Sequence, residues 1–176
     1  YVTNGMTRNW FNSDMRAQLY KLGGLNTEKG GQLVLDAAPL EEPNLVFRNL
    51  GHLRFQKPDD SWGLGQVGVS FGAATGDLDG DGDIDLVVNN FGAPASVYRN
   101  LSTGSNRIKI RLIGQKSNRY GIGALVRLKT KNGVQVRYLT LARGFASSDS
   151  PIIHFGLGKN EKIDEISVRW PSGHLQ

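Results

Sequence analysis

The chain has 176 residues, of which 39% are hydrophobic and 23 are glycine, and it contains no cysteine. This length allows one large or two small domains with a buried core. The composition excludes a disulfide framework and cysteine-ligated metals, and no apolar run approaches the roughly 20 residues that a membrane helix needs.

The charge is divided unevenly along the chain. Residues 1–100 hold 8 Lys and Arg against 12 Asp and Glu, a net charge of −4, whereas residues 101–176 hold 13 against 4, a net charge of +9. Because the sign changes near the polar stretch "NLSTGSN" (100–106), we expect two domains, residues 1–103 and 104–176. A solvated outer face is the preferred interpretation of the positive charge, with a polyanion-binding patch as the alternative; we expect no nucleic-acid partner.

The N-terminal part predicts one helix. The helix runs from about Ser13 to Leu22, with Ser13 or Asn12 as its cap and Gly23-Gly24 at its end. The first five residues, "YVTNG", resemble the end of a strand, and the first residue is not Met. We therefore expect a fragment or a processed product.

The same part contains an internal repeat. The segment "LVFRNL" (45–50) recurs 51 residues later as "SVYRNL" (96–101), and a period near 50 is typical of β-propeller blades. The first unit is the longer one, so we place an insertion at roughly residues 6–43, which includes the predicted helix.

Five aspartates occupy every second position of "GDLDGDGDIDL" (76–86), namely Asp77, Asp79, Asp81, Asp83 and Asp85. Calcium takes 6–8 oxygen ligands from carboxylates and carbonyls, and it offsets the repulsion between such carboxylates. We therefore predict a calcium site. Asp77, Asp79 and Asp81 supply side-chain oxygens, Asp83 supplies its backbone carbonyl, and Asp85 closes the shell, while Gly82 allows the sharp turn.

The residue that follows this loop distinguishes it from an EF-hand. An EF-hand needs a bidentate Glu at position 12 and flanking helices, but Val88 stands at that position within the strand-like "IDLVVNN" (84–90). We expect a loop that joins two strands. Calcium is preferred over Mg²⁺, whose octahedral geometry is stricter, and over a solvated acidic turn without an ion.

The C-terminal part predicts five strands, because alternation and turn signals dominate it, with basic and apolar residues alternating in its first two runs. Asn132-Gly133 separates two of these runs and is a strong hairpin signal. Five strands in about 70 residues favour a small antiparallel sandwich or barrel. The five runs are "RIKIRLIG" (107–114), "ALVRLKT" (124–130), "VQVRYLTL" (134–141), "PIIHFGLG" (151–158) and "KIDEISVRW" (162–170).

Other constellations are weaker. "GLGQVG" (63–68) fits a dinucleotide-binding fingerprint, but no helix follows it. Ser147, Ser148, Asp149 and His154 lie close in sequence, as in a hydrolase, but the strand-turn-helix setting of a nucleophile elbow is absent. His154 lies inside an apolar strand, where we expect a packed residue.

With these residues in view, two family resemblances emerge. "FGAATGDLDGDGDIDLVVNN" (71–90), followed by "VYRN" (97–100), resembles the FG-GAP/VCBS repeat, a calcium-binding blade unit of integrin-like β-propellers. "NRYGIGALVRLKT" (118–130), "RGFASSDSPIIHFGLG" (143–158) and "ISVRWPSGHLQ" (166–176) resemble the ASPIC/UnbV domain. That domain follows such repeats in cartilage-acidic-protein-like and many bacterial exported proteins.

The resemblance implies an all-β fold, in which partial propeller blades precede a small antiparallel β-domain. It also implies that the five aspartates bind calcium, that the protein is extracellular, and that no catalytic activity is established. About one full repeat and part of another are present, which is too little for a closed propeller.

We therefore expect a non-enzymatic calcium-binding protein, secreted or at a cell surface, that adheres to a protein or glycan ligand there or in a matrix. One alternative is a structural protein whose blade edges pair between chains into a fibre or lattice. A glycan-active enzyme is a second alternative. It needs paired carboxylates at catalytic distance, and the dense acidic cluster is already assigned to the metal.

Overall fold

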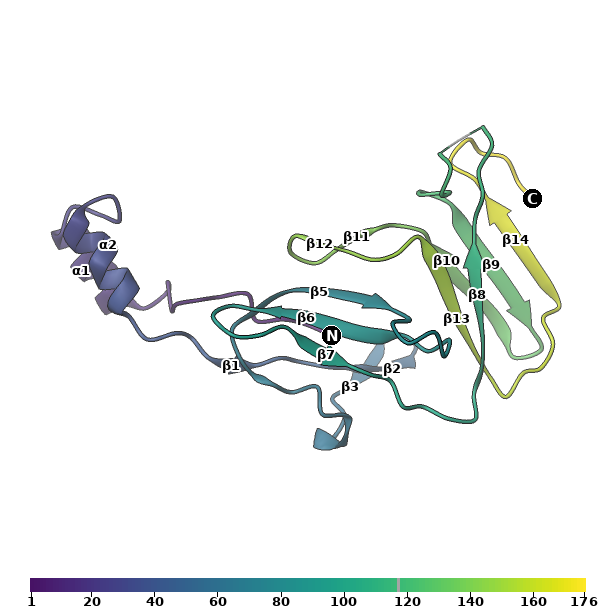
Figure 1. Cartoon of the computed structure of the whole chain (residues 1–176), viewed down its shortest axis with the longest axis horizontal. Coiled ribbons are helices and arrows are strands. Elements are labelled where there is room, and N and C mark those ends of the chain that lie inside the picture. Colours follow the sequence, from purple (N-terminus) through teal and green to yellow (C-terminus); the bar gives the residue numbers. More distant parts are fainter. Residues whose placement is uncertain (117) are drawn as a thin grey trace. The chain divides into compact units, whose positions relative to one another are not determined.

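A computed structural model describes residues 1–116 and 118–176 as short strands in small sheets, with two short α-helices (Figure 1). The predicted all-β class is therefore confirmed. No helix in this described part is long and apolar enough to cross a bilayer. The contacts divide the chain into unit 1 (Tyr1–Gly72 and Asn89–Ala95) and unit 2 (Ala73–Val88 and Ser96–Gln176). The expected boundary between residues 103 and 104 stays a prediction.

The first helix of unit 1 agrees with the sequence. Helix α1 spans Ser13–Lys21, and the side chain of Asn12 caps it by accepting hydrogen bonds from the backbone N–H groups of Asp14 and Met15. Such a cap satisfies donors that the first helical turn leaves unpaired.

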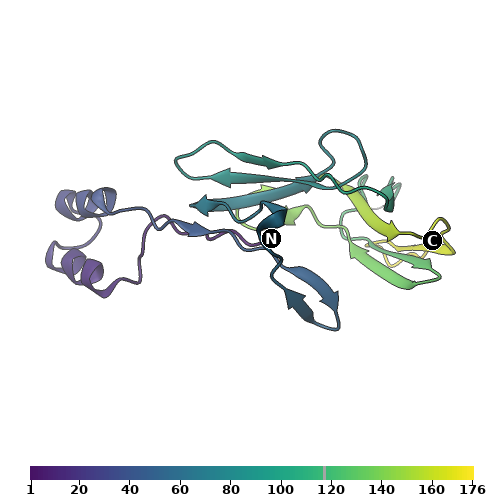
Figure 2. The ribbon, with the colours of Figure 1, turned by 90° about the horizontal axis from the view of Figure 1, so that it is seen from below.

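A second helix was not predicted, so the expectation of a single helix is wrong. Helix α2 spans Glu28–Asp36 and contains Gly30-Gly31, which disfavour a helix. Thr27 caps it, accepting from the backbone N–H of Gly30 at 3.1 Å. A Cβ atom on Gly30 would lie 2.0 Å from the carbonyl oxygen of Gly24, so glycine is required there. Figures 1 and 2 show the two helices side by side.

The strands of unit 1 are short. Strand β1 (Glu42–Pro43) pairs with β4 (Val67–Gly68), and β2 (Arg48–Gly51) pairs with β3 (Arg54–Gln56) in a hairpin visible in Figure 2. A 3₁₀ turn, η1, covers Asp60–Trp62.

Two longer strands, β5 (Ser70–Gly76) and β6 (Asp85–Asn90), contribute to both units. Strand β6 lies between β5 and β7 (Ser96–Tyr98) in one sheet. Propeller blades have four strands, so the assignment of this three-stranded sheet to a blade stays a prediction.

Unit 2 contains two further sheets that share one core. The order β10-β9-β14 forms the first sheet, β13 pairs with β8 in the second, and β11 pairs with β12 in a small hairpin. The bounds are β8 (Asn106–Arg111), β9 (Leu125–Thr130), β10 (Gly133–Tyr138), β11 (Ala142–Arg143), β12 (Ser147–Ser148), β13 (Ile152–Gly158) and β14 (Glu165–Arg169).

The core of unit 2 follows the predicted alternation. Val126 and Leu128 of β9 and Phe155 of β13 are fully buried, while Arg127 and Lys129 between and beyond the β9 residues are exposed. The two sheets therefore pack on each other through one apolar cluster, as a small sandwich requires.

The hairpin at Asn132-Gly133 is confirmed, but its turn lies one residue earlier than expected. Thr130 pairs with Gly133, so Lys131 and Asn132 form the turn. Gly133 has φ +124° and is the first residue of β10. Its conformational freedom is used to begin the strand rather than at the centre of the turn.

Candidate metal site

The acidic stretch connects β5 to β6. Asp77, Asp79, Asp81 and Asp83 lie in the loop, and Asp85 is the first residue of β6. The loop folds around the carboxylate of Asp77, which accepts hydrogen bonds from the backbone N–H groups of Gly80 (2.9 Å) and Gly82 (3.0 Å). Both glycines have positive φ, +81° and +94°, which other residues rarely adopt.

Three of the five carboxylates come together. One carboxylate oxygen each from Asp77, Asp79 and Asp85 lies within 4.8 Å of the other two. Calcium–oxygen bonds of 2.3–2.6 Å allow two ligand atoms of one ion to be about 5 Å apart at most. The geometry and the hard oxygen donors therefore fit a single hard cation.

Asp85 anchors this cluster. Its side chain is buried, and its two oxygens accept hydrogen bonds from the backbone N–H groups of Leu78 (2.9 Å) and Asn100 (2.8 Å). One carboxylate thus fixes the start of the acidic loop and the segment after β7. Val88, at the EF-hand's position 12, is fully buried in β6 and cannot reach the cluster as a ligand.

The other two aspartates have other side-chain contacts. Asp81 accepts a hydrogen bond from the backbone N–H of Asp83 at 2.8 Å and lies 3.7 Å from the guanidinium of Arg99. Asp83 forms an ion pair with Arg107. The expectation that these two residues complete the metal shell stays a prediction.

Three basic side chains form ion pairs with four of the five aspartates. Lys109 contacts Asp77, Arg107 contacts Asp83, and Arg99 contacts both Asp79 and Asp81. Arg107 and Lys109 lie on β8, on the face opposite the partly buried Ile108 and Ile110 that pack against the core. The sequence indicated which face these basic residues occupy. It did not indicate that this face meets the acidic loop.

This pairing changes the electrostatics of the loop. The hydrogen bond from Lys109 is the largest influence on Asp77 and holds the pKa of its carboxyl below the ordinary value; burial opposes this, and the N–H groups of Gly82 and Gly80 assist it. His154 of β13 pairs with Lys109 across the sheet. Burial is the main cause that lowers the pKa of His154, the charge of Asp77 opposes it, and Lys109 adds to it.

The residues that resembled a hydrolase make other contacts. Asp149 accepts hydrogen bonds from Arg143 Nε (2.8 Å) and from the backbone N–H of Thr75 (2.7 Å). Ser147 donates to the carbonyl of Arg143, and Ser148 donates to the carbonyl of Asp149. Within the described residues, the hydrogen bonds therefore do not form a Ser-His-Asp relay.

Comparison with known proteins concerns the strands that build the core of unit 2. Residues 114–176 match the family described as ASPIC and UnbV. The ASPIC and UnbV region includes β9, β10, β13 and β14, and with them most of the buried apolar cluster. The resemblance of residues 71–100 to the FG-GAP/VCBS repeat stays a prediction.

Three curated relatives are all named cartilage acidic protein 1. The human protein is 33% identical over 113 residues, the Xenopus tropicalis protein 34% over 113, and the Mus musculus protein 31% over 112. Each alignment covers 61% of this chain and 17% of the relative. The chain thus corresponds to about one sixth of each relative's length, and includes the ASPIC and UnbV region.

Proposed function

We propose that this chain is a calcium-binding, non-enzymatic part of a secreted or cell-surface protein that serves in binding or adhesion. The observation that carries the proposal is the carboxylate cluster of Asp77, Asp79 and Asp85, whose oxygens lie within 4.8 Å of one another. When bound, the ion would supply positive charge that offsets the repulsion between these carboxylates. It would thereby hold the loop between the end of β5 and the start of β6.

An extracellular location agrees with this chemistry. Sites in extracellular modules bind calcium with dissociation constants on the order of 10⁻⁴–10⁻³ M, so such a site fills outside the cell and empties inside it. The relatives' name refers to cartilage, which supports the same location. The proposed partner is a protein or glycan ligand at a cell surface or in a matrix.

Calorimetric titration tests the metal site. We expect CaCl₂ to bind with a stoichiometry of one, a submillimolar to millimolar dissociation constant, and a weaker response to MgCl₂. Asp79→Ala should abolish the binding heat, because it removes an exposed ligand without touching the core. As the matched control, Asp59→Ala removes an exposed aspartate in unit 1 and should leave binding unchanged. If the wild-type chain binds no calcium at about 10 mM CaCl₂, the proposal is contradicted.

A structural role is the second candidate, and the edge strand β10 favours it. In the described residues, β10 pairs with β9 and with no other strand, and Val134, Val136 and Tyr138 along it are exposed. An unprotected edge of this kind can pair with another chain. Light scattering with and without calcium separates the candidates, since a strict monomer at high protein concentration excludes a fibre.

A further inference from the structure

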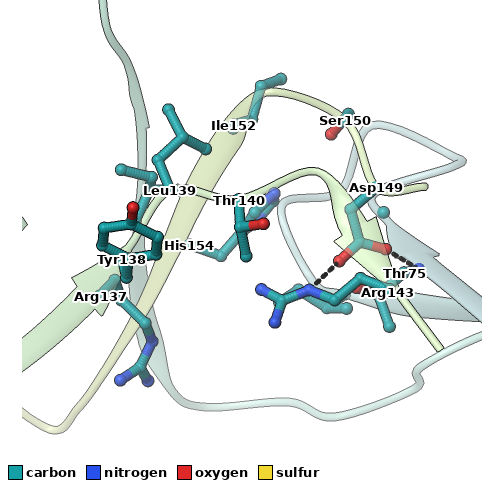
Figure 3. A pocket seen from close by; sticks show the side chains of 13 residues that line it. Thr75, Arg137, Tyr138, Leu139, Thr140, Arg143, Asp149, Ser150, Ile152 and His154 are labelled. Atoms are coloured by element: carbon teal, nitrogen blue, oxygen red, sulfur yellow. Dashed lines mark hydrogen bonds and ion pairs between the residues drawn. The ribbon is translucent and has the colours of Figure 1, made fainter. Parts of the chain in front are cut away.

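A small cavity in unit 2 is lined by polar and apolar side chains together (Figure 3). It encloses about 110 Å³, and Arg137, Arg143, Thr140 and Ser150 contribute to its wall. Among the described residues that line it, Asp149 is the one carboxylate. The three aspartates of the candidate metal site do not belong to this lining, so the cavity calls for a separate explanation.

Asp149 fixes the position of Arg143. Its two oxygens accept hydrogen bonds from Arg143 Nε (2.8 Å) and from the backbone N–H of Thr75 (2.7 Å), as the dashed lines in Figure 3 show. Asp149, the one carboxylate among the described lining residues, is therefore already paired. The terminal nitrogens of Arg143 have no protein partner in the part of the chain that the structure describes, and its side chain is 53% exposed.

Arg137 supplies a second positive charge in a fixed position. Its guanidinium carbon lies 5.3 Å from the centre of the buried Phe155 ring, and Nη1 donates to the carbonyl of Val136 at 3.1 Å. The hydroxyl groups of Thr140 and Ser150 make no hydrogen bond to other described residues. The wall thus holds two guanidinium groups, the imidazole of His154 and the hydroxyls of Thr75, Tyr138, Thr140 and Ser150, against one carboxylate that is already paired.

The backbone beside Arg143 is strained. Between β11 and β12, Ala146 adopts φ +47°, which is uncommon for a residue with a side chain. Ser147 closes this turn by donating to the carbonyl oxygen of Arg143. Strain of this kind gathers at binding sites, where surrounding contacts maintain it.

We propose that this cavity binds the carboxylate group of a small acid or an acidic sugar. The planar guanidinium of Arg143 matches a carboxylate through two parallel hydrogen bonds, and Thr140 and Ser150 add hydroxyl donors to the wall of the same cavity. The volume suits a carboxylate with few attached carbons, and a larger ligand extends into solvent. The site is distinct from the candidate metal ligands, because Gly76 and Ile84 of the acidic stretch line the cavity but Asp77, Asp79 and Asp85 do not.

Titration of the full chain followed by NMR tests this site. The Nε–H resonance of Arg143 is observed in EDTA while sodium acetate replaces sodium chloride at constant ionic strength. We expect a saturable shift with a dissociation constant on the order of 1 mM, as for a ligand with few contacts. Glucuronate should saturate the same resonances and glucose should not. Equal affinities for acetate and glucuronate assign recognition to the carboxylate alone, and tighter glucuronate binding adds a sugar contact.

Three variants locate the effect. Arg143→Gln should weaken acetate binding at least about tenfold, and Arg143→Lys should also weaken it, because the charge is kept but the paired hydrogen bonds are lost. Thr140→Val should weaken it several-fold with little change to the fold. Arg127→Gln, on the exposed face of β9, is the matched control and should bind as the wild type does. Shifts that are linear in acetate, or unchanged affinity in all three cavity variants, overturn the proposal.

Discussion

The ammonium group of Lys109 contacts the Oδ2 atom of Asp77, one of the three carboxylates that gather at the end of β5. The same carboxylate thus faces a fixed cation from strand β8 and, in the proposed function, a calcium ion. Two positive charges at one carboxylate repel each other. Occupation of the site by calcium is therefore expected to weaken or displace the contact with Lys109.

Neutralising Lys109 should separate these two effects. In Lys109→Met, calcium affinity should rise several-fold, because a competing cation is removed, while the melting temperature in EDTA should fall. Calorimetry and thermal unfolding, each with EDTA and with calcium, measure both. Lys129→Met, which removes an exposed lysine from β9 in the other sheet of unit 2, is the control and should change neither quantity. A fall in melting temperature of equal size with and without calcium would make Lys109 a purely structural residue.

The geometry ranks the aspartates as calcium ligands. Asp79→Ala should lower calcium affinity at least about tenfold, since ligand charge sets affinity in such sites. Asp81→Ala should lower it less, because the side chain of Asp81 lies outside the three-carboxylate cluster and faces Arg99. Both residues are exposed, so both variants should fold. Equal losses would favour the five-ligand shell expected from the sequence.

Asp85 should matter for stability even without calcium. Its buried carboxylate accepts hydrogen bonds from Leu78 and Asn100, so Asp85→Ala leaves two backbone N–H groups without their partner. We expect a loss of about 1–3 kcal/mol in the free energy of unfolding, measured by urea denaturation in EDTA. An unchanged unfolding free energy in EDTA would show that Asp85 does not anchor the loop.

The lowered pKa of Asp77 predicts a pH dependence. An unfolded aspartate titrates near pH 3.9, and Lys109 holds the pKa of Asp77 below that value in the folded state. The folded state is then stabilised above about pH 4, and this stabilisation is lost as the pH falls through the lowered pKa. In EDTA, the difference in melting temperature between the wild type and Lys109→Met should shrink from about pH 5 to about pH 2. A difference that stays constant over this range contradicts the assignment.

A core substitution provides the calcium-independent reference. Leu128 is fully buried between the sheets of unit 2, and Leu128→Ala should cost about 2–5 kcal/mol. The loss should be the same in EDTA and in calcium. If calcium restored the stability of this variant, the loop and the core would be coupled more strongly than their contacts indicate.

Patterns that depend on neighbours in sequence predicted much of the fold. Alternation located β8 and β9 because each strand has one apolar and one polar side, and Asn12 marked the start of α1 because a cap acts within three residues. Helix α2 was missed for a physical reason. Gly30 is unfavourable for a helix by itself, and the benefit of its close contact with Gly24 appears only in the folded chain.

The candidate site likewise has one part that the sequence predicted and one part that it did not. The spacing of the aspartates predicted a metal-binding loop, and the clustering of Asp77, Asp79 and Asp85 agrees with it. The ion pairs with Arg107 and Lys109 were not predictable, because they join segments more than twenty residues apart. The role of Asp149 was hidden for the same reason: its partner in the first half of the chain is the backbone of Thr75.

Strand β8 is constrained from both of its sides. Ile108 and Ile110 pack against the core, and Arg107 and Lys109 on the other side of the strand reach the acidic loop. A shift by one residue exchanges the two sides of a strand. A single-residue insertion within β8 would therefore turn the basic side chains toward the core and break their ion pairs with the aspartates. An insertion at the Lys131-Asn132 turn would disturb neither the core nor these ion pairs. Natural variants should accept length changes at that turn and exclude them from β8.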